Sequence, residues 1–205
     1  MKADGTEVAV SQGNSSCVGV VVRDASKNIA FFMAKTSKNS IAWSGSHSSL
    51  NITGITENSN GYTSSSPGIT DTFRTWTTTN YNNGETGVSN TDNIVAQCTS
   101  DTTSNNAAKY CRSIVNPVTG TYDGYLGSPA EWVVVFDNLS AINSALSTIG
   151  GTQLTSTDSG YSSGGDTYTR YWTSGEYRAS NAWGLAFDSS LSYPYFGLNG
   201  KSNSD

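Results

Sequence analysis

The amino-terminal part of the chain contains two short apolar runs separated by turn-forming residues. Residues 17–22 (Cys-Val-Gly-Val-Val-Val) and residues 29–34 (Ile-Ala-Phe-Phe-Met-Ala) are rich in β-branched and aromatic side chains. Asp24, Ser26 and Asn28 lie between the runs and favour a turn. Apolar runs of this length on either side of a turn are typical of antiparallel strands. The pattern predicts a β-hairpin over residues 17–34.

Residues 44–90 are dominated by Ser, Thr, Asn and Gly and show little periodicity. Large apolar side chains nevertheless recur in and beside this stretch, which is unusual for a disordered tract. They are Trp43, Ile52, Ile55, Phe73, Trp76 and Tyr81. We therefore predict long ordered loops here and no linker.

A first helix is predicted from about Thr91. Ile94 and Cys98 have the i, i+4 spacing of one helix face, and Asp92 suits a helix amino terminus. Residues 107–111 either continue this helix or form a short second one.

The clearest helical signal begins at Ser128. Ser128 and Glu131 fit an S-x-x-E capping box, and Pro129 suits the first helical position. The apolar face that follows contains Trp132, Val133, Val135 and Phe136. A further helical segment is predicted over residues 140–146, and it should end before the glycine pair at 150–151.

Beyond residue 151 the chain is rich in Gly, Ser, Thr and Tyr, and strands are predicted over residues 168–173 and 182–187. The order is hairpin, helices, strands, which is typical of an α+β fold with helices on one side of an antiparallel sheet. We expect one domain over residues 1–205, with two main helices and long ordered loops.

The chain is acidic and contains few charged residues. Only 13 % of its residues are charged, and the formal net charge is −5. Such a chain lacks the basic surface that neutralises nucleic-acid phosphates, so we expect no nucleic-acid partner. It has neither a basic amphipathic helix nor an apolar run of membrane-spanning length, so we expect no direct membrane insertion.

The chain contains three cysteines, Cys17, Cys98 and Cys111, and a single histidine, His47. An odd count argues against a disulfide framework, and we favour three small core residues over a Cys98–Cys111 bridge. A zinc site is expected least, because His47 stands alone in the sequence. We therefore predict no metal site and no cofactor.

Residues 123–132 (Asp-Gly-Tyr-Leu-Gly-Ser-Pro-Ala-Glu-Trp) resemble the D-W-Y-L-P-S-x-x-E-L motif of C-type-lectin-fold proteins of gut bacteria and their phages. Further motifs follow in the family's order over residues 141–151, 171–177 and 181–183, and two more precede it at 42–44 and 90–95. Together they resemble the variable proteins of diversity-generating retroelements and their non-diversified relatives. The resemblance implies a C-type-lectin-like fold, with residues 1–16 as an extension, 17–170 as scaffold and 171–205 as a variable ligand-binding region.

In that family the stretch after the Tyr-Trp-Thr-Ser motif forms the exposed ligand-binding face. The resemblance carries this role to Arg178, Ala179, Ser180, Gly184, Ala186, Ser189, Ser190, Leu191, Ser192, Tyr193, Tyr195, Phe196, Gly197, Leu198 and Asn199. Adenine mutagenesis of Asn codons cannot produce Glu, Gln, Lys, Met or Trp, and residues 184–200 contain none of these. Those residue types are scarce throughout the chain, so this agreement is weak support.

The chain departs from the family pattern at several positions. Gly124, Gly127 and Gly175 stand where the family usually has Trp, Pro and Thr. The family also continues into a final strand that closes the sheet against the first one, whereas this chain stops at residue 205. We interpret the missing strand as truncation, cleavage or donation by a partner.

Tyr193, Tyr195 and Phe196 lie close together among small polar residues, a mixture that paratopes use. Pro194 favours a loop or a sheet edge there, although the alternative is that these aromatic residues pack inward from a strand. Trp172, Trp183 and Phe187 are predicted to belong to the core.

The residues favour a binding protein over an enzyme. A lone histidine and the absence of a G-x-S-x-G motif leave little nucleophilic chemistry, and the cysteines lack the setting of the formylglycine-generating oxidases that share the fold. The calcium-ligating E-P-N, Q-P-D and W-N-D motifs of sugar-binding lectins are absent, although calcium-independent sugar binding stays open.

We therefore expect a calcium-independent adhesin that recognises a protein or glycan receptor on a cell surface. The expected location is extracellular, on a bacterial surface or a virion, although residues 1–5 show no signal peptide. Either the protein leaves the cell without one, as a phage part would, or a leader has been removed. The alternative is a structural pilus or phage tail-fibre subunit, whose partners would be its neighbouring subunits.

Overall fold

The computed structural model describes residues 1–38, 41–47, 49–56, 69–154, 162–163, 166–188 and 195–202. At residues 162–163, 166–170, 187–188 and 195–199 it describes the backbone. Within these ranges the chain is mixed α and β, with five α-helices, one short 3₁₀ turn (Val10–Gln12) and two antiparallel sheets. None of the helices in the described ranges is long and apolar enough to cross a membrane.

The predicted amino-terminal hairpin is confirmed. Strands β1 (Gly19–Asp24) and β2 (Ile29–Ala34) pair in register from Gly19 opposite Ala34 to Asp24 opposite Ile29. In the connecting turn the Asp24 carboxylate accepts hydrogen bonds from Ser26 and Lys27. Asn28 adopts a positive φ of 54°, which asparagine tolerates better than most residues.

The loop predicted for residues 44–90 is wrong over part of its length, because helix α1 (Asp71–Asn82) lies there. Its sequence is rich in Thr and Asn, which have weak helix propensity. The helix is stabilised by packing instead: Phe73 is completely buried, and its ring lies 5.1 Å from Trp183. Thr70 caps the amino terminus by accepting a hydrogen bond from the Phe73 amide.

Helix α2 (Gly87–Gln97) begins four residues before the predicted Thr91. Thr86 and Ser89 form a capping box in which each side chain accepts from the other residue's backbone amide. The sequence did not reveal this start, because the third helical position holds Ser89 where a capping box usually has glutamate or glutamine. Helix α3 (Ala107–Arg112) is a separate short helix, which settles the alternative left open for that segment.

The capping box predicted at Ser128 is confirmed, and helix α4 runs from Pro129 to Asp137. The Ser128 amide donates to Glu131 at 2.6 Å, and the Glu131 amide donates to the Ser128 hydroxyl at 3.4 Å. Helix α5 (Leu139–Thr148) follows directly, and Gly150, at a φ of 69°, ends it as predicted.

The second sheet has the strand order β3-β4-β5-β6. It contains β3 (Ser162–Ser163), β4 (Asp166–Arg178), β5 (Asn181–Asp188) and β6 (Tyr195–Gly200). The two strands predicted after residue 151 are thus confirmed in β4 and β5. Tyr195, for which the sequence favoured a loop or a sheet edge, begins β6 at one edge of this sheet.

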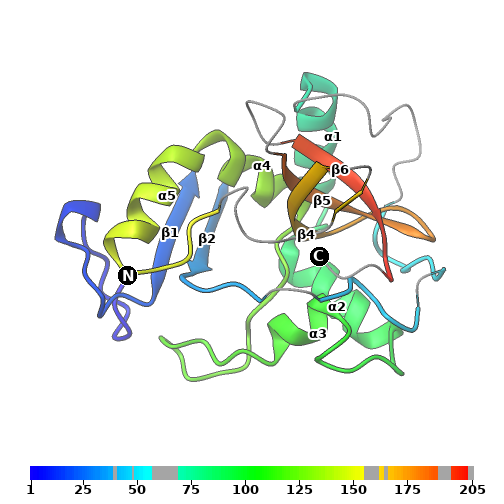
Figure 1. Cartoon of the computed structure of the whole chain (residues 1–205), viewed down its shortest axis with the longest axis horizontal. Coiled ribbons are helices and arrows are strands. Elements are labelled where there is room, and N and C mark those ends of the chain that lie inside the picture. Colours follow the sequence, from blue (N-terminus) through cyan, green and yellow to red (C-terminus); the bar gives the residue numbers. More distant parts are fainter. Residues whose placement is uncertain are drawn as a thin grey trace.

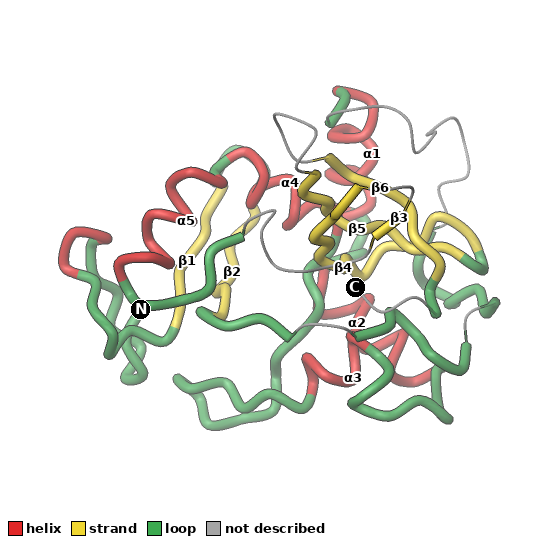
Figure 2. The backbone as a smooth tube through the Cα atoms, viewed as in Figure 1, coloured by secondary structure: helices red, strands yellow, loops and turns green. Residues whose placement is uncertain are grey.

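Helix α4 joins the two sheets. In Figures 1 and 2 the β1–β2 hairpin and α5 lie on one side of the molecule, and the four-stranded sheet lies on the other with α1, α2 and α3 around it. Helix α4 contacts β1 and β2 as well as β4. The expected single sheet with two main helices on one side is wrong, because the described residues form two sheets and five helices. Helix α4 does pack on β4, where the ring of Trp132 lies 5.5 Å from that of Tyr171.

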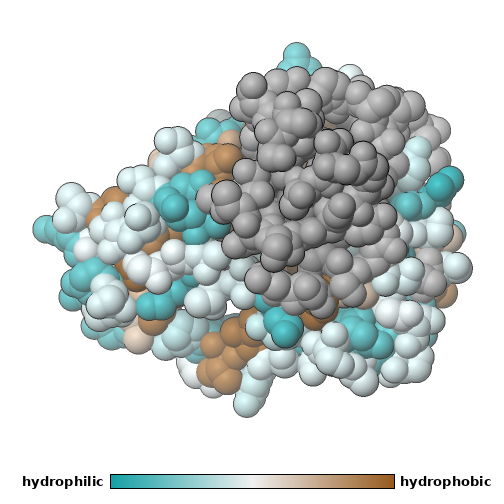
Figure 3. All heavy atoms as spheres, in the orientation of Figure 1, coloured by the Kyte–Doolittle hydropathy of each residue, from teal (hydrophilic) through white to brown (hydrophobic). Residues whose placement is uncertain are grey.

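Among the residues whose side chains are described, the core comprises two hydrophobic clusters. One extends from the hairpin through α4 and α5 to Trp183 and Leu185, and the other surrounds Trp43 and Trp172 between the 41–55 loop, α2 and α3. The described part of the surface in Figure 3 is mostly hydrophilic, with small hydrophobic areas between. Cys17 and Cys98 are buried, Cys111 is partly buried and all three are free, as favoured from the sequence.

Candidate ligand-binding face

The turn between β4 and β5 carries the first residues of the predicted ligand-binding face. Arg178 and Ser180 are exposed, and Ala179 is half-buried between them. The side-chain oxygen of Asn181 accepts hydrogen bonds from Arg178 Nε at 2.7 Å and from the Ser180 hydroxyl at 2.9 Å. The Arg178 guanidinium also lies 5.8 Å from the centre of the Tyr177 ring. Asn181 therefore orients two exposed side chains from the first position of β5.

Beneath this turn, a buried ion pair connects the two ends of the candidate face. Glu176 lies in β4 and Lys201 directly follows β6, and both side chains are completely buried. Lys201 Nζ also donates to the Leu50 carbonyl at 2.8 Å, and Glu176 Oε2 accepts from the Ile52 amide at 3.0 Å. The ammonium group lies 4.6 Å from the centre of the Trp43 ring. The pair therefore also holds the 41–55 loop against the sheet.

The backbone of Lys201 reinforces the same junction. Its amide donates to the Ser180 carbonyl at 3.1 Å, and its carbonyl accepts from the Ser44 amide at 2.9 Å. Lys201, at the end of the candidate face, is thus hydrogen-bonded both to the β4–β5 turn and to the 41–55 loop.

The Tyr-Trp-Thr-Ser motif of residues 171–174 is hydrogen-bonded to two separate segments, residues 41–43 and Gly127. The Trp172 indole donates to the Ile41 carbonyl at 2.9 Å, and the Trp43 indole donates to the Thr173 carbonyl at 2.8 Å. The Ser174 amide donates to the Gly127 carbonyl at 2.8 Å, just before α4. Two of these bonds join an indole N–H to a backbone carbonyl and the third joins two backbone groups, so the motif fixes the scaffold beside the face.

Trp172 and Trp183 are both buried, as predicted. Trp183 lies among three aromatic rings, with centroid distances of 5.1 Å to Phe73, 6.1 Å to Trp76 and 5.4 Å to Tyr177. The side chain of Phe187, also predicted for the core, lies outside the described residues.

Two of the three glycines that depart from the family pattern, Gly124 and Gly175, occupy places without room for a side chain. A β-carbon on Gly124 would lie 2.3 Å from the Cys111 carbonyl oxygen. A β-carbon on Gly175 would lie 2.4 Å from Pro129 Cγ, in the first turn of α4. The Trp and Thr that the resemblance implies at 124 and 175 therefore do not fit this backbone.

The remaining predicted face residues fall into three groups. Gly184 and Ala186 are buried in β5, which is covered on both sides, so they belong to the interior and not to an exposed face. Residues 189–193 lie outside the described residues. Residues 195–199 form the backbone of β6, where Phe196 pairs opposite Leu185 and Leu198 opposite Trp183.

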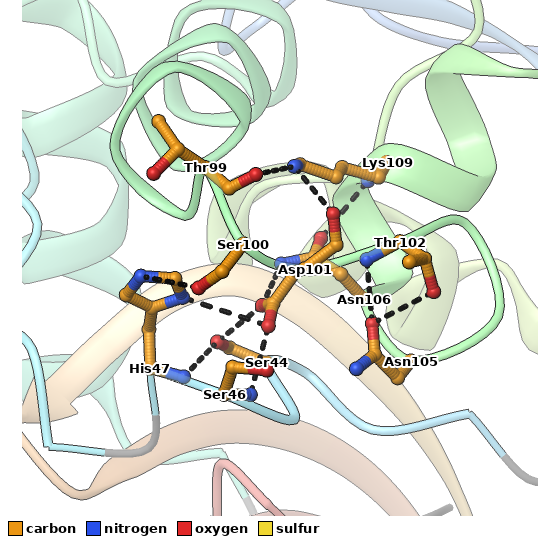
Figure 4. A network of polar contacts seen from close by, with 10 residues as sticks. All are labelled: Ser44, Ser46, His47, Thr99, Ser100, Asp101, Thr102, Asn105, Asn106 and Lys109. Atoms are coloured by element: carbon orange, nitrogen blue, oxygen red, sulfur yellow. Dashed lines mark hydrogen bonds and ion pairs between the residues drawn. The ribbon is translucent and has the colours of Figure 1, made fainter.

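A second polar site, which sequence reasoning missed, surrounds Asp101 (Figure 4). The Asp101 carboxylate accepts hydrogen bonds from the Ser44 hydroxyl at 2.6 Å, the Asn106 amide group at 2.8 Å and the Ser46 backbone amide at 2.8 Å. Burial alone would raise the pKa of this carboxyl, but these hydrogen bonds outweigh it and lower the pKa. Asp101 is therefore a buried carboxylate that keeps its negative charge.

His47 lies at the edge of this network, with Nδ1 3.5 Å from Asp101 Oδ1 and Nε2 3.4 Å from the Ser100 hydroxyl. Cys98, at the end of α2, brings its sulfur into the same group. The only sequence signal for this site is the Cys-x-x-Asp spacing of 98–101, which we did not connect with His47.

Comparison of the chain with protein-family models, with curated proteins and with solved structures gives no match. The fold family and the function therefore rest on the residues and contacts described above.

Proposed function

We propose that this chain is a calcium-independent binding protein with a C-type-lectin-like fold, which recognises a protein or glycan receptor on a cell surface. Its ligand-binding face comprises the β4–β5 turn at 178–180 and the segment from 189 to 199. The proposed setting is the outside of a bacterium or a virion. The proposed source of variation in this face is retroelement mutagenesis.

The observation that carries this proposal is the buried Lys201–Glu176 ion pair. It fixes the beginning and the end of the segment 178–200 with side chains that lie outside that segment. Trp183 and Leu185 anchor its middle strand in the core. A segment held in this way tolerates changes at its exposed positions, because substitutions away from caps and core contacts shift stability by only about 0.5 kcal/mol.

The chemistry of the face suits recognition without strong electrostatic attraction. Arg178 and Ser180 are exposed and positioned by Asn181, and tyrosine is abundant in the sequence that follows. Arginine and aromatic side chains supply most of the binding energy in many interfaces, and small polar residues adapt around them.

The test is a comparison of surface binding and stability in matched variants. One variant carries Arg178→Ala with Tyr193→Ser and Tyr195→Ser, and the control carries Tyr122→Ser, which removes an aromatic ring that is 68 % exposed outside the face. We expect the face variant to lose adhesion to host-cell or bacterial surfaces with an unchanged melting temperature, and the control to keep both. Loss of stability together with intact adhesion of the folded fraction would overturn the proposal.

A structural-subunit role is the second candidate, and the position of β6 favours it. In the described strand order β6 is at the sheet edge, which is the position where a strand from another subunit can join a sheet. This role predicts that the face variant assembles poorly. It also predicts that even the wild-type chain binds no receptor. Sedimentation of the wild-type chain, with and without added peptides of β-strand sequence, separates the two roles.

A further inference from the structure

Three potential metal ligands from two parts of the chain, the 41–47 segment and the end of α2, meet beside that helix. They are the imidazole of His47, the thiol of Cys98 and the carboxylate of Asp101, and their ligand atoms all lie within 4.8 Å of one another. Cys98 is completely buried, Asp101 is 5 % exposed and the His47 side chain is 20 % exposed. The group is therefore shielded from water on the cysteine and aspartate sides and open on the histidine side.

The strongest indication of a bound cation is at His47 Nδ1. It is buried and makes no hydrogen bond within the described part of the protein, although the Asp101 carboxylate is 3.5 Å away. Buried polar nitrogens normally have a partner, because leaving one without costs about 1–3 kcal/mol. A cation between the imidazole and the carboxylate would satisfy both.

We propose that His47, Cys98 and Asp101 bind a divalent transition-metal cation of the zinc class, and that the metal fastens the 44–47 loop to the end of α2. His47 binds through Nδ1, Asp101 through Oδ1, and Cys98 as a thiolate whose proton passes to the solvent. A water molecule on the open side completes a tetrahedral set.

The distances are close to those that such a site needs. Tetrahedral zinc with bonds of about 2.0–2.3 Å places its ligand atoms roughly 3.3–3.6 Å apart. The His47–Asp101 separation of 3.5 Å already meets this. The widest separation, within 4.8 Å, needs a closure on the order of 1 Å, which side-chain rotation supplies.

The ligand types select the cation. A thiolate with an imidazole and one carboxylate is a set that suits zinc and its neighbours, whereas calcium and magnesium prefer oxygen alone. The three hydrogen bonds to Asp101 would act as outer-shell support, because they hold the carboxylate in place. Two of them are to Oδ2 and one is to Oδ1, so Oδ1 keeps a second lone pair for a metal.

The experiment uses the full chain after removal of metals with a chelator. Zinc is titrated against a chromophoric competitor, and cobalt is used as a spectroscopic probe because a thiolate ligand gives a near-ultraviolet charge-transfer band. We expect one zinc per chain, a rise in melting temperature on zinc addition, and the thiolate–cobalt band.

Two ligand variants and one control decide the assignment. His47→Gln and Cys98→Ser should each lower zinc affinity by more than about 100-fold, and Cys98→Ser should also abolish the cobalt band. Cys111→Ser, a second cysteine outside the cluster, should change neither. His47→Gln is the more informative variant, since Nδ1 has no hydrogen bond to lose and the glutamine amide can replace the Nε2 contact with Ser100.

Circular dichroism and melting without metal establish that each variant is folded. The proposal is overturned if the wild-type chain binds no zinc stoichiometrically, or if the folded His47→Gln and Cys98→Ser variants keep wild-type affinity. It is equally overturned if calcium raises the melting temperature and zinc does not.

Discussion

The ammonium group of Lys201 and the carboxylate of Glu176 form an ion pair from which water is completely excluded. The two residues lie on either side of the candidate ligand-binding face in the sequence, and the pair also holds Leu50 and Ile52 of the opposite loop. Removing both charges from water is costly, so the pair is favourable only while each partner and its hydrogen bonds are present.

Replacing Lys201 with methionine should therefore destabilise the protein strongly. The methionine side chain fills similar space but leaves the Glu176 carboxylate buried without its cation, which typically costs about 3–5 kcal/mol. Urea unfolding monitored by tryptophan fluorescence measures this loss. A Glu176→Gln, Lys201→Met double variant should recover part of it, because the uncompensated charge is gone; a double variant as unstable as the sum of both single variants would show that the two charges are not coupled.

A second prediction concerns Gly175, whose position in β4 lies against Pro129 of α4. A β-carbon there would come within 2.4 Å of Pro129 Cγ, and the rigid proline ring cannot rotate away. Gly175→Ala should cost about 1–3 kcal/mol through this overlap. Ser180→Ala, an exposed change in the same hairpin, is the control and should stay within about 0.5 kcal/mol of wild type. Equal denaturation midpoints for the two variants would contradict the close packing of β4 on α4.

The elements that could be predicted from the sequence are those with local signals. The β1–β2 hairpin follows from two apolar runs around a turn, and α4 follows from the Ser128–Glu131 capping box. Both signals act over a few residues, so no knowledge of the rest of the fold was needed.

Helix α1 could not be predicted because its sequence lacks such a local signal. Its Thr- and Asn-rich sequence has little helix propensity, and its stability comes from Phe73 packing on Trp183, more than a hundred residues later. The start of α2 was missed because Ser89 replaces the usual acidic residue of a capping box.

The candidate sites depend on the same long-range contacts. The sequence shows His47 as a solitary histidine, and only the fold brings it beside Cys98 and Asp101. Likewise, the resemblance placed Gly184 and Ala186 on the exposed face, but both faces of β5 are buried over residues 182–186. Which face of a strand is covered depends on its neighbours, and a single sequence does not contain that information.

A third prediction concerns Trp132, which carries the contact between α4 and β4. Its ring lies 5.5 Å from that of Tyr171, but the side chain is half-buried and not fully buried as the sequence suggested. Trp132→Ala should therefore cost about 3 kcal/mol, the lower end of the range for aromatic truncation. Trp132→Phe should lose much less, because it keeps a ring and removes an indole N–H that makes no hydrogen bond in the described structure. A melting temperature unmoved by the alanine change would refute the contact.

The last prediction concerns the pH dependence of stability through Glu131. This side chain is buried, and its carboxylate accepts hydrogen bonds from the Ser128 amide at 2.6 Å and the Tyr125 hydroxyl at 3.3 Å. Burial is the dominant effect and raises the pKa of Glu131 above its ordinary value of 4.5. The folded state therefore holds this proton more tightly than the unfolded chain does.

It follows that the contribution of Glu131 to stability is greatest below pH 4.5 and is lost as the pH rises through the raised pKa of the folded state. Glu131→Gln has no such proton to lose, and its amide oxygen can still accept from the Ser128 amide. The variant should thus gain stability relative to wild type as the pH increases across that interval, as measured by urea unfolding from below pH 4.5 to about pH 8. The control is Thr70→Ala, which removes the side-chain cap of α1 and should cost about 1 kcal/mol with little dependence on pH. Parallel stability curves for wild type and Glu131→Gln would mean that the carboxyl titrates alike in the folded and unfolded chain, in contradiction to its burial beneath Tyr125.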